Sequence, residues 1–174
     1  MPLQMNNMTI TIKDETLRRA AEEGGARGFL EAVTAAVRAA VGGEITAEAM
    51  ELLTADQMTL LAFDTLRAEV EEGGFIQLIH NGWGDFFFRN PFAKVLRLWG
   101  LNDLSKLMYE VARLYGRYGE ELTAEMNDDE FMALYEAHPD FDEPDDTFID
   151  DVEKYIEAIA TYVDEHLNDF VTVV

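Results

Sequence analysis

The apolar residues of this chain recur every three or four positions over most of its 174 residues. This spacing is typical of amphipathic α-helices, whereas half-buried β-strands would require strict alternation of apolar and polar residues. Only residues 8–12 and 171–174 have weak strand character, as frayed ends or as one short pair. The pattern therefore predicts an all-α fold, a single helical domain of about seven or eight helices.

Capping residues and glycines mark where several of these helices begin and end. Thr54-Ala55-Asp56-Gln57 fits a capping box, in which a hydroxyl and an amide satisfy free backbone N–H groups. Thr46 and Asn90-Pro91 are further start signals. Gly73-Gly74 ends one helix just before apolar residues begin another, which predicts a sharp helix–turn–helix corner.

The last helix is expected to begin at Thr147 and to run to about Leu167, after an acidic loop between Pro139 and Pro144. At 100° per residue, one face of this helix is apolar and the opposite face is acidic. The apolar face holds Phe148, Val152, Tyr155, Ile156, Ile159 and Val163.

Charge is distributed very unevenly along the chain, whose formal net charge is −22. Residues 1–42 are neutral, residues 43–89 carry −7 and residues 90–118 carry +3. Residues 119–174 contain nineteen acidic residues and a single base, Lys154. Charge confined to one region indicates a surface for a partner of opposite sign. The sign also argues against direct nucleic-acid binding, because phosphates would be repelled.

We therefore expect the partner to be a basic protein. The candidate partner-binding carboxylates are those of the last helix and of the acidic loop before it: Asp140, Asp142, Glu143, Asp145, Asp146, Asp150, Glu153, Glu157 and Asp164.

Other classes of function receive little support from the sequence. The chain has no cysteine, its three histidines are isolated, and it lacks a Gly-x-Ser-x-Gly nucleophile motif. A calcium loop starting at Asp140 would need Gly at its sixth position and Glu at its twelfth, where this chain has Asp145 and Asp151. No apolar run approaches the roughly 20 residues that span a bilayer, and no secretory signal precedes residue 13. We expect a non-enzymatic cytoplasmic protein without cofactor, metal or membrane association.

The stretch around the Gly pair is the most unusual in the chain. Its distinctive residues are Glu69, Gly73, Gly74, Phe75, Gln77 and Asn81. Glycine supplies positive φ at the predicted corner, and Phe75 can fill the junction. Gln77 and Asn81 lie one helical turn apart, so they can either tie down backbone groups or face a pocket. Both the structural interpretation and a pocket at Gly73–Trp83 follow from this pattern.

Two separated motifs resemble the DNA-mimic-protein family of small acidic bacterial helical domains, otherwise catalogued as a domain of unknown function. The first motif is a Glu followed by Gly-Gly-Phe-x-Gln and Asn, in residues 69–81. The second is Phe-Asp-Glu-x-Asp-x-x-Phe, in residues 141–148. The resemblance covers about residues 44–170, including the ending at 162–170. Glu72 and Pro144 stand where Asn and Leu are usual in the family.

The resemblance implies an all-helical protein, often a dimer, whose acidic face imitates DNA and occupies a basic partner such as a DNA-binding protein or a transcription factor. It also predicts two parts, an N-terminal helical extension at 1–43 packed on a DNA-mimic-like domain at 44–174. A homodimer is one expectation for the assembly. Two rival hypotheses stay open: a small-molecule-binding or enzymatic domain with a pocket at Gly73–Trp83, and an acidic soluble protein without a charge-specific partner.

Overall fold

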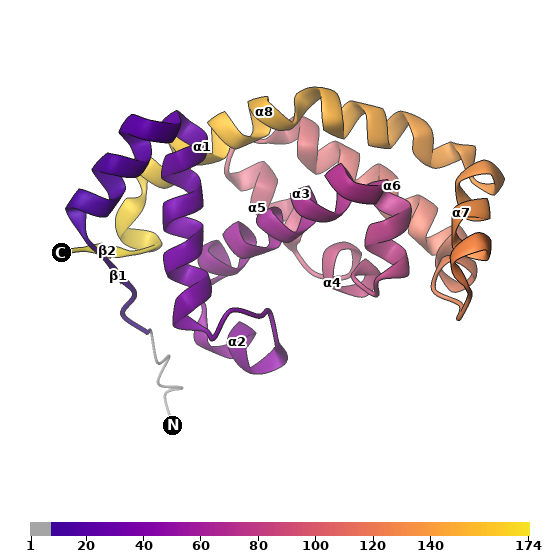
Figure 1. Cartoon of the computed structure of the whole chain (residues 1–174), viewed down its shortest axis with the longest axis horizontal. Helices are drawn as coiled ribbons and strands as arrows, with labels where there is room; N and C mark the ends of the chain where they lie inside the picture. The colour runs from indigo at the N-terminus through magenta and orange to yellow at the C-terminus, as the bar shows by residue number, and fades with distance from the viewer. Residues whose placement is uncertain (1–7) are drawn as a thin grey trace. The chain divides into compact units, whose positions relative to one another are not determined.

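The computed structural model describes residues 8–174 of the chain, and α-helices dominate them (Figure 1). The eight α-helices of this part are α1 (Asp14–Ala40), α2 (Ala47–Leu52), α3 (Ala55–His80), α4 (Gly84–Phe88), α5 (Phe92–Leu98), α6 (Asn102–Leu122), α7 (Asp128–Ala137) and α8 (Asp142–Glu165). Two 3-10 turns, η1 (Pro139–Phe141) and η2 (Leu167–Asp169), accompany them. The predicted all-α fold of about eight helices is confirmed.

The two segments with weak strand character form one short pair. Strands β1 (Thr11–Ile12) and β2 (Thr172–Val173) run parallel, with Thr11 opposite Thr172. The backbone N–H of Asp14 also donates to the carbonyl of Val174 at 3.0 Å. These bonds hold the two ends of the described chain together.

The chain forms two compact units, Met1–Asp64 with Ile156–Val174, and Thr65–Tyr155. Helices α3 and α8 each contribute residues to both units. The boundary that the sequence suggested after residue 43 stays a prediction.

The first unit is organised around α1 and the N-terminal end of α3. Val33 and Val37 of α1 are fully buried, as expected for the apolar face of an amphipathic helix. Arg38 forms an ion pair of 2.6 Å with Asp64. Gln57 donates from its side chain to the carbonyl of Phe170 at 2.9 Å, joining α3 to the C-terminal segment.

The helix starts predicted at Thr46 and at the capping box of residues 54–57 are confirmed, and the start predicted at Asn90-Pro91 lies within one residue of the start of α5. The hydroxyl of Thr54 accepts from the N–H of Gln57, and the Gln57 side chain accepts from the N–H of Thr54. Thr46 caps α2 through the N–H of Ala49. Asn90 accepts from the N–H of Phe92, the first residue of α5.

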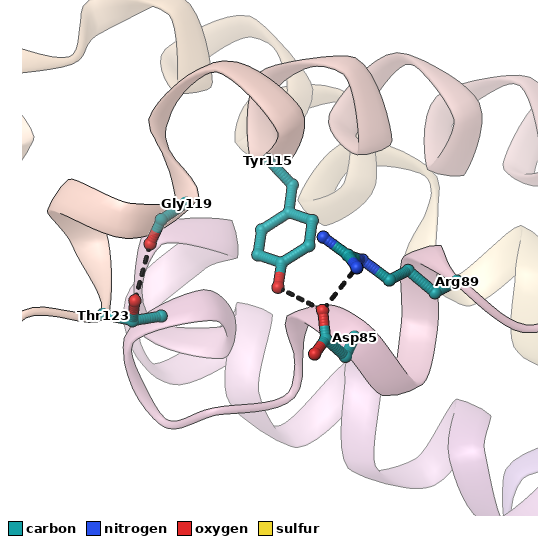
Figure 2. A network of polar contacts seen from close by, with 5 residues as sticks. All are labelled: Asp85, Arg89, Tyr115, Gly119 and Thr123. Carbon is teal, nitrogen blue, oxygen red and sulfur yellow. Dashed lines mark hydrogen bonds and ion pairs between the residues drawn. The ribbon is translucent and has the colours of Figure 1, made fainter.

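The second unit contains a tyrosine held in a slot between two glycines. Tyr115 donates to Asp85 at 2.6 Å, and Arg89 also binds that carboxylate (Figure 2). The hydrogen bond to Asp85 raises the pKa of Tyr115. A Cβ atom at Gly84 or at Gly119 would overlap the tyrosine ring. The two glycines therefore let α6 approach α4 closely.

The structure corrects one predicted helix boundary and confirms the break at the Gly pair. Helix α8 begins at Asp142 rather than at Thr147, so the predicted acidic loop is the turn η1 followed by the first turn of α8. Pro144 is tolerated there because N–H groups in the first turn of a helix have no intrahelical acceptor. The predicted corner at the Gly pair is present: Gly73 and Gly74 leave the helical conformation and form a kink between two helical stretches of α3.

Candidate protein-interaction surface

A polar clamp closes the break in α3. The carboxylate of Glu69 accepts hydrogen bonds from the side-chain amides of Gln77 at 3.0 Å and of Asn81 at 2.8 Å. Glu69 precedes the Gly pair, whereas Gln77 and Asn81 follow it. The three side chains therefore connect the two helical halves on one side of the kink. The polar groups that could have lined a pocket at Gly73–Trp83 are instead bonded to one another.

The two glycines of the break are needed for different reasons. Gly74 has a φ of 73°, which side chains with a Cβ rarely adopt. A Cβ atom at Gly74 would also overlap the carboxylate of Asp145. Gly73 has a φ of −148°, which any residue can adopt, but a Cβ atom there would overlap the side chain of Gln77. The side chain of Gln77 and the carboxylate of Asp145 thus leave no room for a Cβ atom at either glycine.

Asp145 restarts helix α3 after the break. Its carboxylate accepts from the backbone N–H of Phe75 at 2.8 Å, one of the donors that a new helical turn leaves without an intrahelical acceptor. Burial raises the pKa of Asp145 to about 6 from the usual 3.8. The hydrogen bond from Phe75 opposes this shift, while the charges of Asp142 and Asp146 add to it.

Helix α7 and the aromatic core also contribute to the same junction. The hydroxyl of Tyr135 donates to the carbonyl of Gly73 at 2.7 Å. Phe75 is fully buried, and its ring meets that of Phe148 edge to face at 6.0 Å between centroids. Phe75 of the first motif and Phe148, the last residue of the second, therefore pack within one junction, in which α3, α7 and α8 meet.

The predicted partner-binding carboxylates are exposed, with one exception. The exposed members are Asp140, Asp142, Glu143, Asp146, Asp150, Glu153, Glu157 and Asp164. Asp145 is the exception, because it is half-buried and bonded to Phe75. The structure thus separates the predicted set into an exposed group and one structural residue.

Helix α8 presents these carboxylates on the face opposite its core side chains. Phe148, Ile159 and Val163 are fully buried. The proposed carboxylates on α8 occupy exposed positions on the other face of the helix: Asp142, Glu143, Asp146, Asp150, Glu153, Glu157 and Asp164. Lys154 lies 3.9 Å from Asp151, which is outside the predicted set. Acids therefore make up most of the exposed side of α8, together with Thr147, Ile149, Lys154, Ala158 and Thr161.

Helix α7 adds carboxylates that the sequence analysis counted in the regional charge but did not assign to the surface. They are Asp128, Asp129, Glu130 and Glu136, all of them exposed. Asn127 caps α7 by accepting from the N–H of Glu130, and acids in the first turn complement the helix dipole. The acidic run at residues 128–130 was the sequence signal from which these surface carboxylates could have been predicted.

A cavity of about 370 Å³ lies elsewhere, in the first unit. Its walls come from the segment before β1, from the capping box of α3 and from the C-terminal segment: Met8, Thr9, Ile10, Thr54, Asp56, Gln57, Asn168, Asp169, Phe170, Val171 and Thr172. None of these residues belongs to the Gly73–Trp83 stretch.

Within residues 8–174, no helix is long and apolar enough to cross a membrane. Nor do three or more His, Asp or Glu side chains gather there in an arrangement that could hold a metal ion.

Comparison with known proteins connects this geometry to a family. The family described as DMP19-like protein matches residues 51–166, which include the clamp, the Asp145 cap and most of α8. The DNA mimic protein DMP19 of Neisseria meningitidis serogroup B is 33% identical over 124 residues, which cover 71% of this chain and 75% of that protein. The resemblance inferred from the two motifs is thereby confirmed, and the chain belongs to the DMP19-like protein family.

Proposed function

We propose that this protein is a non-enzymatic, cytoplasmic binding protein that occupies a basic DNA-binding protein by imitating the charge of duplex DNA. The carboxylate surface that would carry this activity comprises Asp140, Asp142, Glu143, Asp146, Asp150, Glu153, Glu157 and Asp164. Its exposure along α8, with Lys154 the one base in residues 119–174, is the observation that supports the proposal most. Asp145 is left out because it is engaged in the core.

Charge density sets how much surface the imitation requires. Exposed carboxylates on α8 run from Asp142 to Asp164, roughly 33 Å at a rise of 1.5 Å per residue. Seven of the proposed residues lie there, or about one charge per 5 Å, against about one per 1.7 Å of duplex axis. One helix is therefore about threefold too sparse. The acids of α7, or a second subunit in a homodimer, would supply the rest.

Binding through such a surface has a characteristic dependence on salt. Each exposed ion pair contributes only about 0–1 kcal/mol, so the interaction needs many of them together. Complementary charge chiefly accelerates association and excludes wrong partners, and added salt screens it. We also propose that residues 44–174 carry this activity and that residues 1–43 are an extension of it.

A charge-neutralising variant with a matched control tests the proposal. The test variant replaces Asp150, Glu153, Glu157 and Asp164 with Asn or Gln. The control makes the same four-charge change on exposed residues of α1, namely Glu15, Glu22, Glu23 and Glu31. Both are used to capture basic proteins from a cell lysate at stepped salt, and the affinity for the captured partner is then measured.

We expect the test variant to bind its partner at least about tenfold more weakly, with a flatter dependence on salt, since fewer charges are screened. The α1 control should bind like the parent. Circular dichroism should show an unchanged helical fold in both. If the test variant keeps the parent's partners and salt dependence, the carboxylate surface is ordinary solvated surface and the proposal fails.

A further inference from the structure

Five basic side chains on α5 and α6 form no ion pair with any of residues 8–174, although the chain has 35 Asp and Glu residues. They are Lys94, Arg97, Lys106, Arg113 and Arg117, all of them exposed. Within residues 8–174, no carboxylate oxygen lies within 4.0 Å of their nitrogens. We call these five residues the cationic face.

Most of the other basic residues are locally neutralised. Arg18 and Arg19 pair with carboxylates one helical turn away on α1. Arg38, Arg67 and Arg89 also pair with carboxylates. The cationic face is thus a region where positive charge is left uncompensated in a strongly acidic protein.

The geometry of α6 concentrates this charge. Lys106, Arg113 and Arg117 lie within about 40° of one another around the helix and span roughly 16 Å along it. Helix α5 packs directly on α6, since the hydroxyl of Ser105 donates to the carbonyl of Ala93 at 2.7 Å. The exposed acids on these two helices are Asp103, Glu110, Glu120 and Glu121, so α5 and α6 carry +1 in total and +3 over the part before residue 120.

A docking partner responds to this local charge more than to the net charge of −22. At physiological salt the screening length is about 8 Å, shorter than the stripe on α6. Like charges brought together at an interface are strongly unfavourable, and binding proteins use such repulsion to exclude wrong arrangements.

We propose that the cationic face repels a basic partner and thereby confines its docking to the carboxylate surface. This inference rests on the proposed function, and it assigns to Arg113, Arg117 and their neighbours the task of setting the partner's orientation. Duplex DNA is anionic on every side, whereas this protein would also present basic side chains that a DNA-binding protein avoids.

The test maps where a basic probe touches the protein. The probe is a twelve-residue lysine peptide, joined to nearby carboxylates by a zero-length carbodiimide reaction, with the joined residues identified by mass spectrometry. Glu110 serves as the reporter, because this exposed carboxylate lies on α6 between Lys106 and Arg113. Two variants remove the repulsion, Arg113→Glu/Arg117→Glu and the milder Arg113→Gln/Arg117→Gln.

The matched control is Arg18→Glu/Arg19→Glu, which changes the net charge by the same amount at residues that are already paired. In the parent, we expect the peptide to join the carboxylates of α8 and to leave Glu110 almost unmodified. Reaction at Glu110 should rise at least about tenfold in the Arg113/Arg117 reversal, less in the neutral version, and not in the control.

Three results would overturn the inference: equal reaction at Glu110 and on α8 in the parent, no rise in either Arg113/Arg117 variant, or the same rise in the control. Failure of the proposed function looks different, because the peptide would then not react with α8 in any variant. Circular dichroism establishes that each variant is folded, and the neutral version keeps the test decisive if the reversal is not.

Discussion

At the scale of single residues, Asp145 explains why the two family motifs occur together. Its carboxylate binds the N–H of Phe75, which lies 70 positions earlier in the chain. Gly74 leaves space for that carboxylate, and a Cβ atom there would overlap it. In the first motif, Gly74 leaves a gap and Phe75 provides a backbone N–H donor. In the second motif, the carboxylate of Asp145 fills that gap and accepts the hydrogen bond.

The raised pKa of Asp145 predicts how its contribution to stability depends on pH. In the folded protein the carboxyl group of Asp145 stays protonated up to about pH 6. In the unfolded chain it loses its proton near the usual pKa of 3.8. Between these values the folded state binds more protons, so the contribution of Asp145 to stability falls as pH rises through the window. Asn cannot ionise, so the stability of Asp145→Asn relative to the parent should increase from pH 4 to pH 7.

Urea unfolding at several pH values measures the free energy of unfolding of Asp145→Asn and of the parent. The other carboxylates are the same in both proteins, so their contributions cancel when the two values are subtracted. Asp150→Asn is the matched control, since Asp150 is exposed on the same helix. A difference between Asp145→Asn and the parent that is flat with pH, or that has the opposite slope, would show that Asp145 titrates normally.

At the scale of elements, the kink in α3 depends on backbone freedom at Gly74. Replacing Gly74 with Ala should destabilise the fold by more than about 1 kcal/mol, because its φ is positive and its Cβ would meet Asp145. Gly116 is the control: it is exposed within α6, and a Cβ there meets no atom within 4 Å. Gly116→Ala should stabilise the protein by roughly 0.5–1 kcal/mol.

Thermal or denaturant unfolding of the two variants beside the parent makes the comparison. Equal effects of the two substitutions would mean that the kink does not require glycine at position 74.

Local signals were enough to predict much of this architecture. The capping box at residues 54–57 and the caps of α2 and α5 depend on residues two or three positions apart, which a sequence displays directly. The start of α8 was missed because Pro144 resembles a helix breaker until its place in the first turn is known.

The clamp and its cap were harder to foresee. Glu69 and Asn81 are twelve positions apart, and their contact depends on the direction of the kink. Asp145 resembled its acidic neighbours because nothing nearby in the chain shows that it turns inward toward Phe75. Sequence could therefore identify the unusual residues, but the division between surface and structural carboxylates required the fold.

At the scale of the whole molecule, charge is separated by region. Residues 119–174 supply an anionic surface, while residues 90–118 carry a net charge of +3. Salt adaptation would acidify the surface throughout, whereas residues 1–42 are neutral here. Under the proposed function, this asymmetry would restrict a basic partner to one orientation.

Competition with DNA tests the central claim most directly. The partner captured through the carboxylate surface is bound to a fluorescent duplex, and unlabelled protein is added while fluorescence anisotropy is followed. We predict that the parent protein displaces the duplex with a midpoint that rises with salt, and that the Asp150, Glu153, Glu157 and Asp164 variant displaces it far less. A stable complex containing partner, duplex and protein together would contradict the account.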